Sequence, residues 1–390
     1  MAHSSTVYNQ LLQLIPRHQF EKAVKAYEGD RYVKYFSCWQ QFITLLYAQV
    51  RSKDSLRDIE LSLSAQASRW YHVGLKDIKR STLSDANNSR DYHIYEELFY
   101  ALLHRCKSIT PKHRFRFKNP LYSLDASTID LCLSLFPWAK FRKRKGAIKM
   151  HCLYDHSGAL PSFLVVTDGK KHDVRSVKES SLPLLPDSIV SVDRGYIDFE
   201  WLFSLDKKKV YFVTRAKRNF KYAVTGQQEI SQGARRKGVL FDQVIGLKGY
   251  YPGKDYPKDL RLVGFLDPET GKELRFLTNN FALAASTIAQ VYKARWQIEL
   301  FFKWIKQNLK IKSFLGTTKN AVLTQVWVAM CYYLLLTYIK YQTKYSYSLL
   351  EFSRMFAETI FERMSLIDLL SCNRHNLSRI RDPVGQLALL

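Results

Sequence analysis

Closely spaced cysteine pairs are absent from this sequence. Its six cysteines are scattered along the chain, and no two of them form a C-x-x-C pair. This absence argues against a disulfide-stapled secreted scaffold and against a C-x-x-C redox site, so we expect reduced and mostly buried thiols. The first residues also lack the basic-then-apolar build of a signal peptide. We therefore expect a cytoplasmic protein.

Acidic residues are scarce relative to basic ones. The 390-residue chain has 60 Lys and Arg against 35 Asp and Glu, which gives a formal net charge of +25. A charge of this size attracts polyanions, and nucleic acid is the first candidate. A membrane surface would also attract it, and a ribosome-associated or merely basic protein has the same composition. Charge alone leaves these alternatives open.

Internal repeats and low-complexity tracts are also absent, and only one apolar run is long enough to suggest a membrane span. Residues 321–339 have about the length that crosses a bilayer. They contain Thr324, Gln325 and Thr337, and no second run accompanies them. We therefore expect a buried core helix and no membrane association.

Sequence patterns predict three regions. Residues 1–115 have apolar residues at helical spacing and a polar stretch over 79–90, which favours a helical DNA-binding domain. An ordinary helical domain with a solvated basic face is the alternative. Residues 116–320 are predicted to form an α/β catalytic core, and residues 321–390 a C-terminal helical region that is a candidate for dimerisation.

The predicted core has strand and helix patterns in alternation. Apolar and β-branched runs predict strands over 123–129, 146–154, 160–166, 188–193 and 210–214. Helical patterns follow the third and fourth of these runs, which is typical of a mixed α/β sheet. Residues from about 216 to 282 are rich in Gly, Lys and short apolar runs. They predict a β-rich insertion that loops out of the sheet.

Two aspartates lie on the predicted strands. Asp125 is in the first strand, and Asp193 ends the apolar strand over 188–193. Carboxylates at strand ends converge at the mouth of an α/β sheet. An Asp that ends a buried strand also needs a partner or a metal ion. Both residues are therefore candidates for a site.

A third carboxylate is predicted on a helix. At about 100° per residue, four polar residues fall on one narrow arc beside an apolar arc: Tyr292, Arg295, Glu299 and Lys306. The apolar arc can pack on the sheet and hold the polar arc at its edge. A solvated polar stripe is the alternative interpretation.

Three carboxylates suit phosphoryl chemistry with divalent cations. They can hold two ions about 4 Å apart, which activate water or a 3′-hydroxyl and stabilise the leaving oxygen. Oxygen ligands favour Mg²⁺ or Mn²⁺. We therefore predict Asp125, Asp193 and Glu299 as catalytic metal ligands. The cations on the same helix face, Arg295 and Lys306, are expected to contact DNA phosphates, and Tyr292 belongs to that DNA-facing arc.

A basic run lies near the first predicted strands. Residues 140–149 contain no acid, which favours a track for DNA phosphates. A solvated hairpin edge is the alternative. The residues of this run predicted to bind DNA are Arg142, Lys143, Arg144 and Lys145.

The motifs resemble those of a known family. Tyr292, Arg295, Glu299 and Lys306 have the spacing Tyr-x₂-Arg-x₃-Glu-x₆-Lys, which resembles the YREK signature of bacterial DDE transposases of the insertion sequence 4 family. Asp125 in Leu-Asp-Ala-Ser-Thr and Asp193 in Val-Asp-Arg-Gly-Tyr are similar to that family's first two acidic motifs. The resemblance extends over nearly the whole chain. It implies an RNase H-like (retroviral-integrase-like) core.

The resemblance also implies an activity. A DNA transposase of this kind binds the terminal inverted repeats of its element as a homodimer. It cleaves the ends with two Mg²⁺ or Mn²⁺ ions, passes through a DNA hairpin, and joins the 3′-OH ends to target DNA by cut-and-paste. Such an enzyme works at the bacterial nucleoid. A nuclease that only hydrolyses DNA and a non-catalytic DNA-binding relative, domesticated or repressor-like, are the alternatives.

Overall fold

The chain is divided into two compact units. The computed structural model describes residues 5–70, 73–142, 145–169, 173–179, 182–217, 221–344 and 348–371. Unit 1 comprises the described residues of 1–109 and 308–390, and unit 2 those of 110–307. The helices of the predicted N-terminal and C-terminal regions therefore belong to the same unit. The roles predicted for them, DNA binding and dimerisation, stay predictions.

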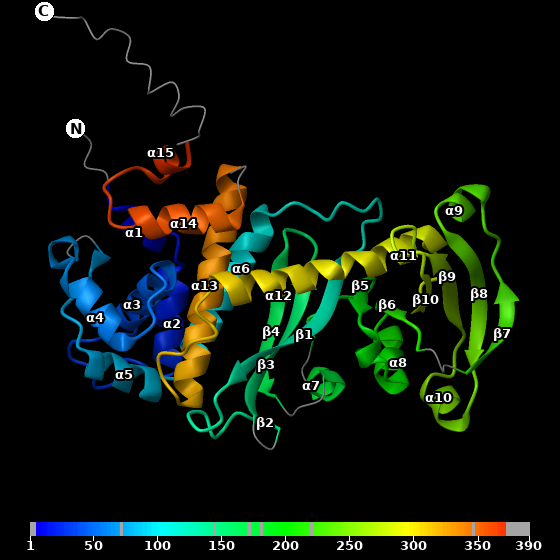
Figure 1. Cartoon of the computed structure of the whole chain (residues 1–390), viewed down its shortest axis with the longest axis horizontal. Coiled ribbons are helices and arrows are strands. Elements are labelled where there is room, and N and C mark those ends of the chain that lie inside the picture. Colours follow the sequence, from blue (N-terminus) through cyan, green and yellow to red (C-terminus); the bar gives the residue numbers. More distant parts are fainter. Residues whose placement is uncertain are drawn as a thin grey trace, which may run out of the picture. The chain divides into compact units, whose positions relative to one another are not determined.

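Unit 1 is a bundle of helices (Figure 1). Helices occupy the stretches with apolar residues at helical spacing, and Ser55 caps one of them by accepting a hydrogen bond from the backbone N–H of Asp58 at 3.0 Å. The helices are α1 (Val7–Gln13), α2 (Arg17–Ala26), α3 (Cys38–Val50), α4 (Leu56–Ser64), the 3₁₀ helix η1 (Ala67–Arg69), α5 (Arg80–Ser89), α6 (His93–Ile109), α13 (Lys319–Thr343), α14 (Leu349–Thr359) and α15 (Leu366–Ser371).

Helix α13 is the core of unit 1. It packs against α3, α5, α6 and α14. Among the described residues it is the one helix long and apolar enough to cross a membrane, yet 94% of its most apolar window is buried inside the protein. Its buried Gln325 side chain donates to the Ser313 carbonyl at 2.9 Å and accepts from the Leu315 N–H at 2.8 Å. The prediction of a buried core helix over 321–339 is confirmed.

The described cysteines are free thiols. Four of the five are buried, and Cys132 is exposed. This confirms the prediction of reduced and mostly buried thiols for these five, and Cys372 lies outside the described residues.

Unit 2 is built on one large mixed sheet. Its described strands are β1 (Leu121–Leu131), β2 (Lys140–Arg142), β3 (Lys145–Asp155), β4 (Leu160–Asp168), β5 (Ile189–Val192), β6 (Tyr211–Arg215), β7 (Tyr222–Gln227), β8 (Val239–Leu247), β9 (Leu260–Leu266) and β10 (Glu273–Thr278). Its described helices are α7 (Asp173–Glu179), η3 (Arg194–Tyr196), α8 (Phe199–Lys207), α9 (Gln232–Arg236), α10 (Tyr250–Asp255), α11 (Ala285–Ala294) and α12 (Trp296–Asn308). The predicted α/β sheet is therefore present.

The first strands of the sheet are antiparallel and the next ones parallel. β3 pairs antiparallel with β1 and with β4. β5 lies parallel to β1, and β6 lies parallel to β5. The parallel strands are connected through α7 and α8, as parallel pairs require a crossover. The spatial order of these five strands is β4-β3-β1-β5-β6.

The predicted β-rich insertion is present, but it does not loop out of the sheet. β10 pairs antiparallel with β6, with Leu277 opposite Thr214. β9, β8 and β7 follow in that order, so the insertion extends the sheet that began with β4 (Figure 1). The expectation of a separate loop was wrong because an edge strand such as β6 offers unpaired backbone groups, which β10 satisfies.

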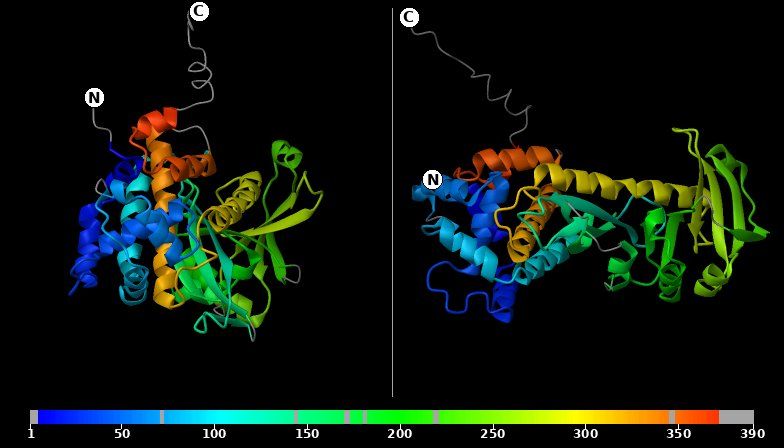
Figure 2. Two further views of the ribbon diagram at one scale, coloured as in Figure 1. Left: turned by 60° about the vertical axis from the view of Figure 1, so that its left-hand side comes forward. Right: turned by 60° about the horizontal axis from the view of Figure 1, so that its bottom comes forward.

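Helices cover both faces of this sheet (Figure 2). On one face, α11 packs on β5, β6 and β9, in a cluster that includes Ile189, Val213 and Ile288. On the opposite face, α8 packs on β6, in a second cluster that includes Val192, Phe212 and Leu202. Successive side chains of a strand point to opposite faces. Residue parity along β1, β5 and β6 therefore tells which face each side chain takes.

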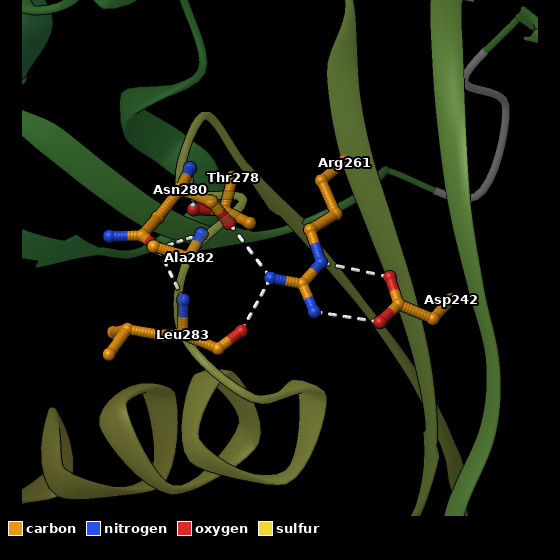
Figure 3. A network of polar contacts seen from close by, with 6 residues as sticks. All are labelled: Asp242, Arg261, Thr278, Asn280, Ala282 and Leu283. Carbon is orange, nitrogen blue, oxygen red and sulfur yellow. Dashed lines mark hydrogen bonds and ion pairs between the residues drawn. The ribbon is translucent and has the colours of Figure 1, made fainter. Parts of the chain in front are cut away.

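A buried ion pair joins the insertion to the start of α11 (Figure 3). The Arg261 guanidinium on β9 donates to both carboxylate oxygens of Asp242 on β8, at 2.8 and 2.7 Å. It also donates to the carbonyls of Asn280 and Leu283, at 3.0 and 2.6 Å. Both charged side chains are almost completely buried, at 3% and 4% exposure. The network fixes the loop from which α11 begins.

Removal of the Asp242 charge tests this network. We expect Asp242→Asn to lower the free energy of unfolding by about 3–5 kcal/mol, because an unpaired buried guanidinium remains. The melting temperature of the protein should fall by about 10 °C. The matched control is Glu273→Gln, whose partner Arg275 lies in an exposed pair at 2.9 Å. It should change stability by less than about 1 kcal/mol. Equal melting temperatures for the two variants would contradict the account.

Candidate active site

Three charged residues stand in a row where the parallel pairing of β1, β5 and β6 ends. Leu124 on β1 is paired with Val192 on β5, and Val192 with Thr214 on β6. The next residue on each strand is Asp125, Asp193 and Arg215 respectively. Adjacent strands lie about 4.8 Å apart. Each of the three lies an even number of residues along its strand from a member of the α11-side cluster (Leu121, Ile189 and Val213), so they are on the face that α11 covers.

Asp125 is a partly buried carboxylate in this row. Its side chain is 20% exposed, and one of its oxygens accepts the N–H of Ala126 at 2.8 Å. Burial raises the pKa of Asp125 to about 6, although the Ala126 N–H and the Arg295 charge both lower it. The nearby charges of Asp193 and Glu299 raise the pKa further. The predicted carboxylates therefore influence one another electrostatically.

Asp193 lies where the chain leaves the sheet. Its carboxylate accepts the N–H of Gly195 at 3.3 Å and so caps the short helix η3. This bond turns the chain sharply after β5. The carboxylate is therefore held at the strand end, next to the position of Asp125.

Arg295 joins the first and third predicted carboxylates. Its Nη1 donates to Asp125 at 2.8 Å, and its Nη2 donates to Glu299 at 2.6 Å. The Arg295 side chain is 12% exposed and that of Glu299 is 34% exposed. Burial opposes the Arg295 charge, but the two carboxylates outweigh it and raise the pKa of Arg295. Charge-assisted bonds of this kind are the strong ones in proteins.

The predicted helix over 292–306 is interrupted at Arg295. α11 ends at Ala294 and α12 begins at Trp296. Arg295 keeps helical backbone angles, with φ −51° and ψ −31°. Its N–H donates to the Tyr292 carbonyl and its carbonyl accepts from Ile298, each at 3.1 Å. These three-residue spacings are tighter than those of an α-helix, so the simple 100° arc places Arg295 only approximately.

Tyr292 and Lys306 lie at two ends of the same helical face. The Tyr292 ring packs on Phe276 at 4.9 Å, and the Arg295 guanidinium lies 5.7 Å from the ring centre. Lys306 donates to the carbonyl of Thr128 on β1 at 2.7 Å. Lys306 therefore holds α12 to the strand that carries Asp125. The prediction that both residues contact DNA stays a prediction.

The predicted basic run lies on a β-hairpin edge. Arg142 on β2 is paired with Lys145 on β3, which is the hairpin that the alternative interpretation expected. Lys143 and Arg144 lie outside the described residues. Binding of DNA by this run stays a prediction.

Arg215 was not predicted as a site residue. It ends β6, directly beside the Asp193 position, and it lowers the pKa of Tyr292, which burial raises. The signal was available, because Tyr211-Phe-Val-Thr-Arg215 is an apolar strand that ends in a charge, as Val192-Asp193 does.

The donor set suits a divalent cation in part. The carboxylates of Asp125 and Glu299 already converge on one cationic group, the Arg295 guanidinium. Carboxylate oxygens are the ligands that Mg²⁺ and Mn²⁺ prefer. Within the described residues, however, no three His, Cys, Asp or Glu side chains are grouped to hold a metal ion. Asp125 and Glu299 therefore supply suitable oxygen donors at one point, and a metal site that includes Asp193 stays a prediction.

Comparisons with known proteins identify relatives of this chain. A family model described as the transposase DDE domain matches residues 116–335. A second model, described as a domain of unknown function, matches residues 3–76.

Three curated relatives match over most of their length. The sequence is 30% identical to the "Probable transposase for insertion sequence element IS5377" of Geobacillus stearothermophilus, over 73% of this chain and 74% of that protein. It is 32% identical to the "Putative transposase y4zB" of Sinorhizobium fredii, over 73% and 78%. It is 23% identical to the "Putative transposase for insertion sequence element IS4SA" of Synechocystis, over 79% and 86%.

The raised pKa of Asp125 has a consequence for stability. Because its folded value of about 6 lies above the ordinary value of 3.8, the folded state binds this proton more tightly than the unfolded state. Ionised Asp125 therefore destabilises the protein above about pH 6, and this effect disappears as the pH falls below about 4. We expect Asp125→Asn to raise the melting temperature at pH 7.5 by about 2–6 °C.

Thermal melting at two pH values tests this expectation. The advantage of Asp125→Asn should vanish near pH 4. Asp130→Asn, an exposed residue on the same strand, serves as the control and should not alter melting at either pH. If Asp125→Asn melts at or below the temperature of the unmodified protein at pH 7.5, ionised Asp125 does not destabilise the folded state.

Proposed function

Because this chain belongs to the transposase DDE domain family, we propose that it transposes DNA with Asp125, Asp193 and Glu299 as its catalytic carboxylates. It is a transposase of the insertion-sequence type, and the family implies an enzyme that cleaves DNA and transfers strands. The observation that carries the residue assignment is the bridge of Arg295 between Asp125 and Glu299, with Asp193 next to Asp125 in strand register.

The finer family assignment rests on topology and motif spacing. The strand order β4-β3-β1-β5-β6, antiparallel at first and parallel after β1, supports an RNase H-like core. The spacing of Tyr292, Arg295, Glu299 and Lys306 supports membership of the insertion sequence 4 family, with its YREK signature.

The metal ions proposed here are two Mg²⁺ or Mn²⁺. When bound, they activate the attacking hydroxyl and stabilise the leaving oxygen at phosphorus. Asp125 and Asp193 offer their carboxylates from a paired strand and a capped turn, so both are held rigidly. Glu299 comes from α12, which Lys306 ties to β1 through the Thr128 carbonyl. This tie keeps the helix carboxylate beside the strand carboxylates.

The Arg295 guanidinium can donate to two kinds of acceptor, the site carboxylates and a DNA phosphate. Without DNA, the guanidinium neutralises Asp125 and Glu299. A DNA phosphate offers the same planar pair of oxygens and binds arginine bidentately. We propose that DNA draws Arg295 from the carboxylates, so that the metal ligands become available when the substrate arrives.

The DNA in question is the insertion sequence itself. We propose that the protein binds the terminal inverted repeats, cleaves the ends through a hairpin, and joins the 3′-OH ends to target DNA by cut-and-paste, in the bacterial cytoplasm. The charge of +25 supports a polyanionic partner. The helices of residues 1–115 are proposed to read the repeats, and the basic run from Arg142 to Lys145 to follow the backbone.

A homodimer on DNA is also proposed. The C-terminal residues 321–390 were the predicted region for it. Helix α13 is buried in the core of unit 1, so it has little surface left for a partner. A dimer contact in this region would therefore use residues after α13. Ile367 on α15 is 72% exposed and is one apolar side chain that such a contact would cover.

The direct test of the catalytic assignment is Glu299→Gln. We expect cleavage of the DNA that flanks the coding sequence to fall more than about 100-fold, because a charged metal ligand is lost. Binding of the same DNA should stay within about twofold, since phosphate contacts elsewhere position the duplex. Glu269→Gln is the control, an exposed carboxylate on the same unit. Unchanged cleavage by Glu299→Gln would refute the assignment.

A strand-transfer assay distinguishes transposition from simple hydrolysis. A pre-cleaved end is mixed with supercoiled plasmid, and joined products are counted. We expect joining by the unmodified protein and none by Glu299→Gln. Cleavage without any joining would identify a nuclease, and binding with neither reaction would identify a non-catalytic DNA-binding relative.

Arg295→Gln tests the exchange between arginine and metal. We expect Mn²⁺ to bind the DNA-free variant at least about tenfold more tightly than the unmodified protein, because an adjacent positive charge has been removed. Titration followed by electron paramagnetic resonance measures this affinity directly. Arg175→Gln is the matched control, since Arg175 forms an exposed i,i+4 pair with Glu179 at 3.0 Å. Weaker Mn²⁺ binding by Arg295→Gln would contradict the exchange.

A further inference from the structure

A second basic site lies on the opposite face of unit 2. A pocket of about 390 Å³ is lined by residues from the start of α8, the ends of β6 and β8, and β10. Its wall includes Leu277, whose side chain belongs to the cluster on the α8 side of the sheet. The pocket is therefore on the α8 side, whereas Asp125 and Asp193 are on the α11 side.

Three lysines surround this pocket: Lys217, Lys221 and Lys248. Strand pairing brings two of them together. Tyr222 on β7 is opposite Leu247 on β8, and just beyond this pair the N–H of Lys248 donates to the Lys221 carbonyl at 3.2 Å. Like charges at facing positions of a strand pair destabilise the pair. A bound anion would offset this repulsion.

The residues that line the pocket include no acidic side chain that could offset the repulsion between the lysines. The nearest acid in the sequence of the wall is Asp198, between Ile197 and Phe199. Its carboxylate already caps α8 by accepting the Trp201 N–H at 2.9 Å and pairs with Lys178 at 3.0 Å. All three pocket lysines are exposed to solvent, so they are accessible to a ligand.

The remaining wall of the pocket is apolar. Ile197, Phe199 and Leu277 line it. A ligand that suits both parts has an anionic group for the lysines and an apolar or aromatic portion for the wall. A nucleotide unit of DNA has this composition, with a phosphate beside a sugar and a base.

The pocket is close, along the chain, to the row formed by Asp125, Asp193 and Arg215. Ile197 follows Asp193 by four residues, and Lys217 follows Arg215 by two. An extended chain spans at most about 3.6 Å per residue, so the wall begins within about 14 Å of Asp193. Each strand of a duplex advances about 3.4 Å per nucleotide. A strand with its cleaved phosphate at Asp193 would therefore reach the pocket within about four nucleotides.

We propose that this lysine pocket binds one nucleotide of the DNA strand cleaved at Asp193, no more than about four nucleotides from the cleaved phosphate. The strand crosses the carboxyl edge of the sheet between the two faces. The proposal rests on the proposed function, since it takes its DNA strand from the cleavage reaction.

The test compares a variant that lacks the three pocket charges with a control variant that lacks three lysine charges elsewhere on unit 2. The pocket variant is Lys217→Gln, Lys221→Gln and Lys248→Gln combined. The control variant is Lys207→Gln, Lys237→Gln and Lys272→Gln combined, three exposed lysines of unit 2 outside the pocket. Duplexes of the DNA that flanks the coding sequence carry 2-aminopurine at one of positions two to six from the cleaved phosphate. Affinity is measured at several salt concentrations.

We expect the pocket variant to lower the slope of log affinity against log salt by about 1–2, because phosphate contacts are lost. A fluorescence change of 2-aminopurine at one of positions two to four should disappear in the pocket variant and persist in the control. Equal slopes and equal fluorescence for the two variants, with cleavage still dependent on Glu299, would overturn the pocket alone. Absence of DNA binding by the unmodified protein would overturn the proposed function and the pocket together.

Discussion

The bridge of Arg295 between Asp125 and Glu299 is the interaction on which the rest of the site depends. It joins a strand carboxylate to a helix carboxylate that lies 174 positions later in the sequence. Without a cation between them, two partly buried negative charges would repel each other. The guanidinium therefore offsets this repulsion between Asp125 and Glu299 before any substrate is bound.

The surrounding structure keeps this bridge in position from three sides. The register of β1 and β5 places Asp193 beside Asp125. Lys306 fastens α12 to the Thr128 carbonyl on β1. The buried Arg261 and Asp242 pair fixes the loop that starts α11, the helix that leads into Arg295. The insertion thus supports the site because it continues the sheet.

Local patterns in the sequence singled out Asp125, Asp193 and Glu299, whose metal-binding role stays a prediction, but they did not predict what surrounds these residues. An apolar strand that ends in Asp193 and a helical arc with Glu299 are visible in a single chain, because both follow from side-chain periodicity. The pairing of β10 with β6 was not visible, since strand partners distant in sequence are not encoded by periodicity. The same limit applies to α13, which packs with helices of the N-terminal half. Arg215 had a readable signal that was overlooked.

The central claim is that Asp125, Asp193 and Glu299 form one metal site that opens when Arg295 turns to DNA. Crystals of the protein with its DNA end and Mn²⁺ test it most directly, through the anomalous scattering of manganese. The account predicts manganese about 2 Å from oxygens of all three carboxylates, with Arg295 bound to a DNA phosphate. Manganese bound elsewhere, or Arg295 still bridging Asp125 and Glu299 in the DNA complex, would contradict it.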